Sequence, residues 1–348
     1  MIRKLIDYYR QFEELSPEEI SRELIEKRHA ERAQALTEVP ALDLSTPAWH
    51  APPDAEAVNA ATYALRRAVN AYPDPVPLHE AIAARHGIEA DHVVAGHGAG
   101  ELLRSAFRPL HGAEVAVAWP GWGYLPRLLS EAGATPVAVE PDVDALAAAP
   151  ARAVVVCNPN DPTGELIDVA ALADRLDEAV WLIVDAALAE FAPGDAHADL
   201  LRARERVIVV RSFSKAHAMA GLRAGYALGN DVTALAPVAG VSAPAQAAML
   251  WALESGEAIV ARRRAAAARE RERLAAALRD TPFAFAAGHG PLIWLESTEH
   301  DGSAIAAGLA AQRIYVTPGA AWGDEKHVRI ALRDGAATDR LSAALADL

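Results

Sequence analysis

Short apolar runs recur through the middle of the chain, and between them lie longer stretches whose apolar residues have helical spacing. Such alternation is typical of repeated strand–helix–strand units, which build a largely parallel sheet covered by helices on both faces. The sequence therefore predicts the α/β fold class. We expect strands at Val93–Val94, Glu114–Ala118, Thr135–Val139, Ala153–Cys157, Trp181–Val184 and Val207–Val210.

Helical patterns flank this alternating region. Residues 3–36 combine charged side chains with Leu, Ile and Ala at helical spacing, and residues 16–19 supply a cap, a proline and acidic residues for a helix start. Residues from about 246 to 278 predict one long helix. A chain of 348 residues exceeds the usual size of one domain. We therefore predict an N-terminal helical arm and linker at 1–45, a large domain at 46–245, and a bridging helix with a small C-terminal domain at 246–348.

Charge and composition restrict the classes of partner. The chain has a net charge of -14 at pH 7, whereas surfaces that bind nucleic acids or anionic membranes gather lysine and arginine. No apolar stretch reaches the roughly 18 to 20 residues of a membrane span, and the N-terminus lacks the apolar core of a secretory signal. The single cysteine, Cys157, excludes an intrachain disulfide. We expect a cytoplasmic protein that acts on small molecules, with no nucleic-acid or membrane partner.

Glycine-rich or polar segments follow four of the expected strands, at the edge where open α/β sheets place their ligand sites. Segment 96–103 is a glycine-rich turn that opens into a helix, which is either an ordinary tight turn or a phosphate site made by free N–H groups. Segment 158–164 contains two prolines and a glycine, which restrain an unusual loop. Asp185 ends an apolar strand, where it either enters a cleft or caps a helix. Segment 211–226 holds a lysine between hydroxyl side chains, with an arginine eight residues later.

Lys215 differs from the other lysines of the chain. Lys4 and Lys27 lie in the charged N-terminal segment and Lys326 in a polar turn, whereas Lys215 follows an apolar strand. Burial lowers the pKa of a lysine amine, as Schiff-base chemistry requires, and an arginine does not undergo such a shift. Lys215 is therefore the candidate reactive amine.

Four motifs, in this order, closely resemble the motif set of fold-type I pyridoxal-phosphate aminotransferases, class I/II of the aspartate aminotransferase superfamily: 158–164, Asp185, 212–215 and 221–226. The nearest branch is the histidinol-phosphate aminotransferase-like one, and the likeness runs from about residue 71 to residue 330. The resemblance implies a large cofactor-binding domain, with a mainly parallel seven-stranded sheet between helices, and a smaller α/β C-terminal domain. It also implies pyridoxal 5'-phosphate as cofactor, an amino donor and a 2-oxo acid as substrates, and a homodimer with shared active sites.

The resemblance assigns a role to each reactive residue. Lys215 carries the cofactor as a Schiff base and moves the proton between substrate and cofactor. Asp185 pairs with the pyridine nitrogen, and Asn158 contacts the phenolic oxygen and the substrate. Trp122 stacks on the cofactor ring, although a tryptophan near Gly and Pro also packs simply as a core residue. Arg329 binds the substrate α-carboxylate.

The likeness also implies a phosphate site. Its expected members are Ala99, Gly100, Ser212, Ser214, Arg223 and, from a second subunit, Tyr72. Tyr72 precedes a Pro-Asp-Pro turn and has the alternative interpretation of a turn anchor. His97, His217 and His289 lack the spacing of metal ligands, so we expect no metal site.

Two positions depart from the family pattern. Leu188 stands where relatives usually have a tyrosine that hydrogen-bonds the phenolic oxygen. Thr317 stands about where histidinol-phosphate enzymes have an arginine that binds the substrate phosphate, which argues against histidinol phosphate. We expect an aminotransferase that acts on an L-amino acid or an amino-acid-like amine. A decarboxylase or lyase on the same fold is the alternative, and Lys215 disfavours a non-catalytic binding module.

Overall fold

The computed structural model describes residues 24, 26–27, 40–194 and 197–348. The expected N-terminal helical arm falls almost entirely outside these residues. The chain divides into two compact units, residues 1–42 and 43–348. The second unit holds the predicted sheet and its helices.

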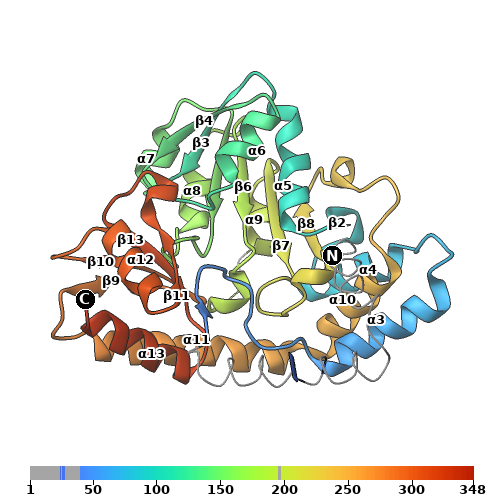
Figure 1. Ribbon diagram of the computed structural model, residues 1–348. Helices are drawn as coiled ribbons and strands as arrows, with labels where there is room; N and C mark the ends of the chain where they lie inside the picture. The colour runs from blue at the N-terminus through green and yellow to red at the C-terminus, as the bar shows by residue number, and fades with distance from the viewer. Residues whose placement is uncertain (1–23, 25, 28–39, 195–196) are drawn as a thin grey trace, which may run out of the picture. The chain divides into compact units, whose positions relative to one another are not determined.

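A seven-stranded sheet runs through the second unit (Figure 1). The strands lie in the order β2-β8-β7-β6-β5-β3-β4. Their bounds are β2 Val93–Gly96, β3 Glu114–Ala118, β4 Thr135–Val139, β5 Ala153–Cys157, β6 Trp181–Asp185, β7 Val207–Ser212 and β8 Gly225–Gly229. Neighbouring strands are parallel except at β8, which is antiparallel to both β2 and β7. The predicted mainly parallel sheet is therefore confirmed.

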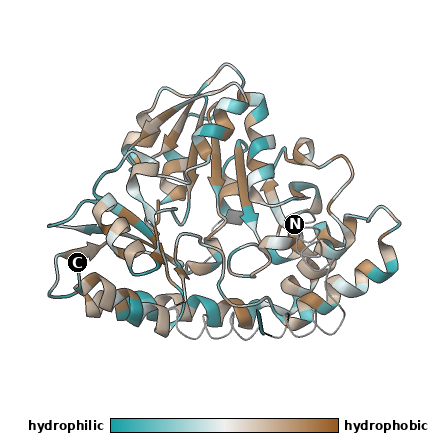
Figure 2. Ribbon diagram, in the orientation of Figure 1, coloured by the Kyte–Doolittle hydropathy of each residue, from teal (hydrophilic) through white to brown (hydrophobic). Residues whose placement is uncertain are grey.

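Alternate residues of the central strands face opposite sides of the sheet. Along β5, Val154 and Val156 belong to one hydrophobic cluster, whereas Val155 and Cys157 belong to the other. The first cluster is covered by α3 (Ala55–Ala68), α4 (Val76–His86), α7 (Val143–Ala148), α8 (Val169–Arg175), α9 (His197–Ala203) and α10 (Ala243–Ser255). The second is covered by α5 (Ala99–Phe107) and α6 (Leu125–Glu131). Because both faces are buried, the central strands are almost continuously apolar, as their colour in Figure 2 shows.

Strand β8 was not among the predicted strands. It has glycine at both ends, and its sequence, Gly-Tyr-Ala-Leu-Gly, contains no β-branched residue. A Cβ atom on Gly225 would lie 2.8 Å from the Arg211 carbonyl oxygen and 3.0 Å from the Ala99 nitrogen. Glycine at this position therefore allows β8 to pass close to both β7 and the start of α5.

The predicted long helix is two helices. α10 ends at Ser255, and α11 begins at Glu257 and continues to Ala277. A Cβ atom on Gly256 would lie 2.5 Å from the Ala252 carbonyl oxygen, so the turn between the helices has no room for a side chain. α10 packs in the core of the large sheet, against α3. The expected division after residue 245 remains a prediction.

A second, antiparallel sheet lies in the C-terminal part of the chain, in the order β12-β13-β10-β9. The elements of this part are β9 Phe283–Phe285, β10 Leu292–Ser297, α12 Gly302–Ala311, β11 Ile314–Tyr315, β12 Thr317–Pro318, β13 His327–Ala331 and α13 Gly335–Ala346. The short strand β1 (Leu42–Asp43) precedes Leu44. The Leu44 N–H donates to the Tyr315 carbonyl, and the Ala331 N–H donates to the Leu44 carbonyl. These bonds hold the segment after Asp43 beside β13.

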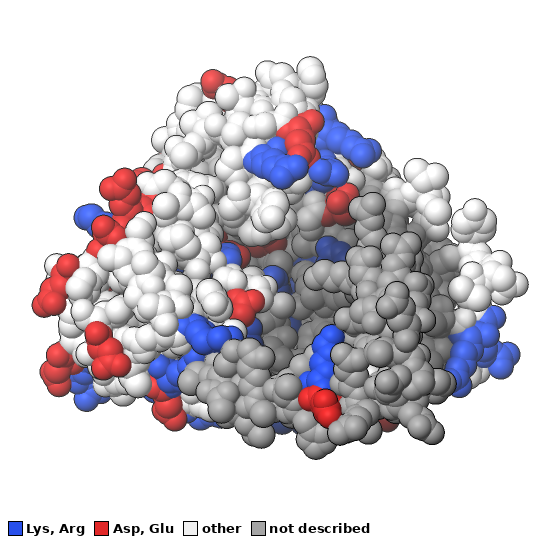
Figure 3. All heavy atoms as spheres, viewed as in Figure 1, with Lys and Arg blue, Asp and Glu red and all other residues white. Residues whose placement is uncertain are grey.

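None of the helices in the described parts of the chain combines the length and the apolar character that a membrane crossing requires. Acidic and basic side chains both appear on the face shown in Figure 3, and the described residues visible there form no extended basic patch.

Candidate active site

A pocket opens at the carboxyl ends of the central strands. Cys157 ends β5, Asp185 ends β6 and Ser212 ends β7, and all three contribute to the pocket wall. Of the residues expected at the site, those that line this pocket are Ala99, Trp122, Asp185, Ser212, Ser214, Lys215 and Arg223. The parallel strand order therefore brings together residues that are far apart in the sequence.

Lys215 lies in the pocket on a tightly held loop after β7. The side chain of Phe213 is 1% exposed, and its backbone N–H donates to the Ala224 carbonyl while its carbonyl accepts from the Met219 N–H. Burial lowers the pKa of the Lys215 amine, and the negative charges of Asp161 and Asp185 oppose this shift. Lys215 is thus a largely buried amine near two carboxylates. Its burial and lowered pKa are the properties expected of a reactive lysine.

Asp185 is a buried carboxylate with few donors around it. Its side chain accepts the Ala187 N–H at 3.1 Å, and the thiol of Cys157 lies 3.9 Å from the other carboxylate oxygen. Burial raises the pKa of Asp185 from 3.8 to about 6. A cation placed against this carboxylate would compensate for the lost hydration. The protonated pyridine nitrogen of pyridoxal phosphate is such a cation, so Asp185 fits that group.

The start of α5 and Arg223 together make a candidate anion site. The helix begins at Ala99, after Gly98 with φ 89°, and no side chain caps its first N–H groups. A Cβ atom on Gly98 would lie 2.8 Å from Arg223 Nη2, so the guanidinium reaches this turn. Arg223 itself adopts a left-handed conformation, with φ 54°, which costs about 1 to 2 kcal/mol for a non-glycine residue. The free N–H groups and the guanidinium together fit a phosphate group.

The serines and Trp122 complete this end of the pocket. Ser212 Oγ accepts the Ser214 N–H at 3.1 Å, so the two serines lie side by side. The backbone N–H of Trp122 donates to Cys157 Sγ at 3.4 Å. A Cβ atom on Gly100 would lie 3.3 Å from the Trp122 ring, so the indole covers the start of α5. Trp122 therefore provides a flat wall beside the anion site.

Four of the expected residues do not line this pocket: Gly100, Asn158, Tyr72 and Arg329. Both polar atoms of the Asn158 side chain bond to Ile167, whose carbonyl accepts at 3.1 Å and whose N–H donates at 2.9 Å. These bonds use one of the two N–H groups of the amide nitrogen. The expected contacts of Asn158 with the phenolic oxygen and the substrate therefore remain predictions. Tyr72 has a side chain that is 88% exposed, outside the pocket lining.

Asp161, from the same loop as Asn158, lines the pocket next to Lys215, although the sequence analysis gave it no role. The one signal for it in the sequence is a carboxylate within a restrained loop at a strand end. Leu188 is buried and also lines the pocket. The pocket wall is therefore apolar at the position where relatives usually have a tyrosine.

A second hollow adjoins the pocket and shares Trp122, Asp161 and Lys215 with it. Its other wall includes Arg329 of β13 and Thr317 of β12. Lys215 therefore faces both a side that fits the cofactor and a side that contains the expected substrate arginine.

Two tryptophans connect this hollow to the loop after β3. Trp322 Nε1 donates to the Gly121 carbonyl at 2.7 Å, and Trp119 Nε1 donates to the Trp322 carbonyl at 2.9 Å. Trp322 lines the hollow together with Arg329. The two indoles thus join the segment between β12 and β13 to the loop after β3.

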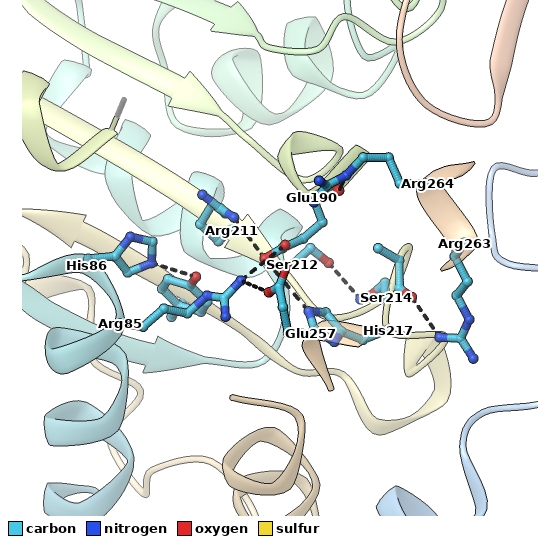
Figure 4. Close-up of polar contacts among 12 residues, drawn as sticks. Arg85, His86, Glu190, Arg211, Ser212, Ser214, His217, Glu257, Arg263 and Arg264 are labelled. Carbon is cyan, nitrogen blue, oxygen red and sulfur yellow. Dashed lines mark hydrogen bonds and ion pairs between the residues drawn. The ribbon is translucent and has the colours of Figure 1, made fainter. Parts of the chain in front are cut away.

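A charged network surrounds the loop that carries Lys215 (Figure 4). Glu190 accepts from Arg211 at 2.8 Å and from Arg85 at 3.4 Å, and His217 lies 3.8 Å away. Burial acts to raise the pKa of Glu190, but His217 and the two arginines hold it well below its usual value. The loop is also fixed from its other side, because Arg263 donates to the Ala216 carbonyl at 2.6 Å.

The histidines have no metal-binding arrangement in the part of the chain that the structure describes, where no group of three or more His, Cys, Asp or Glu side chains could hold a metal ion. His217 is instead a partner of Glu190.

The central sheet and its helices match the architecture of fold-type I aminotransferases. The chain belongs to the family of class I and II aminotransferases, whose model matches residues 42–345. It is 35% identical over 292 residues to an aromatic amino acid aminotransferase of Rhodococcus jostii, covering 78% of this chain and 80% of the relative. It is 32% identical over 306 residues to histidinol-phosphate aminotransferase 1 of Mesorhizobium japonicum, covering 80% of this chain and 82% of that relative.

A solved structure shares the fold. The crystal structure of histidinol-phosphate aminotransferase from Sinorhizobium meliloti, in complex with pyridoxal-5'-phosphate, superposes with a TM-score of 0.79. The two chains are 27% identical, and the match covers 88% of this chain and 90% of that one. The expected enzyme class, an aminotransferase, is therefore confirmed, and these relatives give no support to the decarboxylase or lyase alternative.

Proposed function

We propose that this aminotransferase uses pyridoxal 5'-phosphate, attached at Lys215, to transfer an amino group between an L-amino acid or amino-acid-like amine and a 2-oxo acid. The observation that supports this most strongly is that Lys215, Asp185 and Arg223 line a single pocket. A buried amine, a buried acid and an anion site match three parts of this cofactor: the aldehyde, the ring nitrogen and the phosphate.

Each residue has a task that its surroundings support. When bound, pyridoxal phosphate supplies an electron sink for the charge that develops on the amine-bearing carbon of the substrate. Lys215 removes and returns the proton at that carbon, and its lowered pKa leaves more of the amine neutral for this task. Asp185 holds the proton on the ring nitrogen. Trp122 packs on the ring, and the start of α5 with Ser212, Ser214 and Arg223 binds the phosphate.

We also infer a homodimer in which Tyr72 enters the site of the partner. The segment between α3 and α4 supports this, because Val69 is 73% exposed, Tyr72 88% and Val76 52%. Adjacent exposed apolar side chains are typical of an interface. A cytoplasmic location is inferred from the single cysteine, Cys157, which is a buried free thiol.

Reduction of the purified protein with borohydride, followed by peptide mapping, tests the attachment point. We expect the reduced cofactor on the Lys215 peptide. Lys215→Ala should abolish turnover while cofactor still binds noncovalently, and Lys326→Ala, a change at an exposed lysine, should leave both unchanged. Recovery of the adduct on another lysine would contradict the assignment.

Amino-group transfer itself is tested in two half-reactions. Adding an amino donor should bleach the visible absorbance of the cofactor, and adding 2-oxoglutarate should then restore it. A decarboxylase would release carbon dioxide and show no such rapid restoration.

A further inference from the structure

Arg329 of β13 is already paired with a carboxylate of the protein. Its Nη1 donates to Asp161 Oδ1 at 2.8 Å. The two side chains are 12% and 11% exposed, so the ion pair is largely withdrawn from water. Asp161 and Arg329 are 168 positions apart in the sequence, and the pair joins the loop after β5 to the C-terminal sheet.

The other groups of Arg329 are also constrained. Its Nη2 donates to the Ser45 carbonyl at 2.7 Å and lies 3.4 Å from Thr317 Oγ1. Its Nε is buried and has no hydrogen-bond partner among the residues that the structure describes. The guanidinium lies 5.0 Å from the centre of the Trp322 ring. Both Nη atoms of Arg329 are thus engaged with groups of the protein while Asp161 keeps its place.

Apart from Asp161, Arg329 and Lys215, the described residues that line the hollow are uncharged. Its described lining includes the aromatic side chains Trp122, Tyr124 and Trp322 and the hydroxyl of Thr46. The positive charge of Arg329 is therefore compensated before any substrate arrives.

A substrate carboxylate at Arg329 would have to exchange with the Asp161 carboxylate. The displaced Asp161 would then lie in a buried place without its ion partner, close to a second negative charge. A neutral group at the same position leaves the pair intact and avoids this repulsion. The Asp161–Arg329 pair therefore weakens the binding of a carboxylate at this position but does not weaken the binding of a neutral group.

We propose that Asp161 is a specificity-determining residue that occupies Arg329 as an internal carboxylate, so that the site favours amines whose amine-bearing carbon carries a neutral group in place of a carboxylate. This inference rests on the aminotransferase function proposed above. It names the class of amino donor that this site takes best, whereas the 2-oxo acid acceptor, which carries a carboxylate, still has to displace Asp161 from Arg329.

Two unreactive ligands of the same shape test the proposal on the cofactor-loaded protein. 3-Phenylpropionate has a carboxylate and 3-phenylpropanamide has a neutral amide, and neither carries an amine or an oxo group. Calorimetric titration of the wild type should give at least as tight binding for the amide as for the carboxylate. In Asp161→Asn the carboxylate should bind at least tenfold more tightly than in the wild type, while amide binding changes less than threefold.

Two further variants identify the cause. Glu165→Gln removes an exposed carboxylate from the same loop and should leave both affinities unchanged, which controls for net charge. In the double variant Asp161→Asn with Arg329→Gln, the gain for the carboxylate should disappear, because the gain depends on freeing Arg329.

The proposal is overturned if the wild type binds the carboxylate more tightly than the amide, if Asp161→Asn brings no gain, or if the gain survives the loss of Arg329. If Asp161→Asn does not fold, the relative affinities of the wild type for the carboxylate and the amide still test the proposal. Borohydride trapping at Lys215 in the same preparations reports on the proposed function separately, so failure of one idea is distinguishable from failure of the other.

Discussion

Asp185 lies directly opposite Cys157 in the parallel pair of β6 and β5, and the thiol sulfur of Cys157 is 3.9 Å from Asp185 Oδ2. Burial raises the pKa of both groups. Asp185 raises the pKa of the Cys157 thiol further, whereas the hydrogen bond from the thiol lowers the pKa of Asp185. The thiol of Cys157 is a weak hydrogen-bond donor, so it compensates little for the hydration that the buried Asp185 carboxylate has lost.

The burial of Asp185 predicts that the free energy of unfolding of the cofactor-free protein depends on pH. The pKa of Asp185 is raised from 3.8 to about 6, so its contribution to stability is fully present below pH 3.8 and is lost as the pH rises through about 6. Asp185→Asn keeps a neutral side chain at every pH. Above pH 6 the variant should therefore be more stable than the wild type, by up to about 3 kcal/mol.

Denaturant unfolding of both cofactor-free proteins between pH 4 and pH 8 measures the difference. The exposed carboxylate Asp174 on α8 provides a control, because Asp174→Asn should change the free energy of unfolding equally at all these pH values. A gap between Asp185→Asn and wild type that stays constant with pH would contradict the prediction.

The network around Glu190 predicts a large loss of stability in Glu190→Gln. The change removes the carboxylate that Arg211 contacts at 2.8 Å, where the two side chains are 4% and 10% exposed. Breaking a buried ion pair from one side costs about 3 to 5 kcal/mol. Since the pKa of Glu190 is lowered, its contribution is present above pH 4.5 and is lost as the pH falls further.

Glu257→Gln is the matched control for this network. Glu257 also pairs with Arg85, at 3.1 Å, but its side chain is 62% exposed, so its loss should cost less than about 1 kcal/mol. Urea titrations of the two variants at pH 7 measure both costs. Equal losses in the two variants would show that burial is not what makes the Glu190 pair strong.

The inferred homodimer predicts recovery of activity when two inactive variants are mixed. Tyr72→Ala and Lys215→Ala each damage a shared site from different subunits, so a heterodimer formed by subunit exchange contains one intact site. Turnover of the mixture should rise above that of either variant alone. Tyr315→Ala, which alters an exposed tyrosine of β11, should remain active by itself. A fully active monomer in sedimentation would exclude the shared site.

The central strands could be predicted because a strand that is buried on both faces consists almost entirely of apolar residues, as in Ala153–Cys157. β8 left a weaker record, since its two glycines are required by close backbone contact and not by strand propensity. The break at Gly256 escaped prediction because alanine-rich helical sequence continues on both sides of a single glycine.

The site was partly predictable for a different reason. Residues that directly follow strands, such as Asp185 and Lys215, reach the pocket through the sheet topology itself. Within the loop 158–164, the sequence does not reveal which polar side chain turns inward. Asn158 finds its partners at Ile167, nine residues away, whereas Asp161 finds Arg329, 168 residues away. A long-range pair of this kind becomes visible only in three dimensions.

The two indole hydrogen bonds of Trp119 and Trp322 bear on how the hollow beside Lys215 keeps its dimensions. One part of its wall comes from loops that follow strands of the central sheet and another from β12 and β13 of the C-terminal sheet, so its width depends on the separation of these parts. We expect that a change in this separation would alter which substrates fit, even with the same side chains in the wall. Trp119 and Trp322 would then act as a spacer, and selectivity would depend on the separation that their hydrogen bonds maintain as well as on the side chains in the wall.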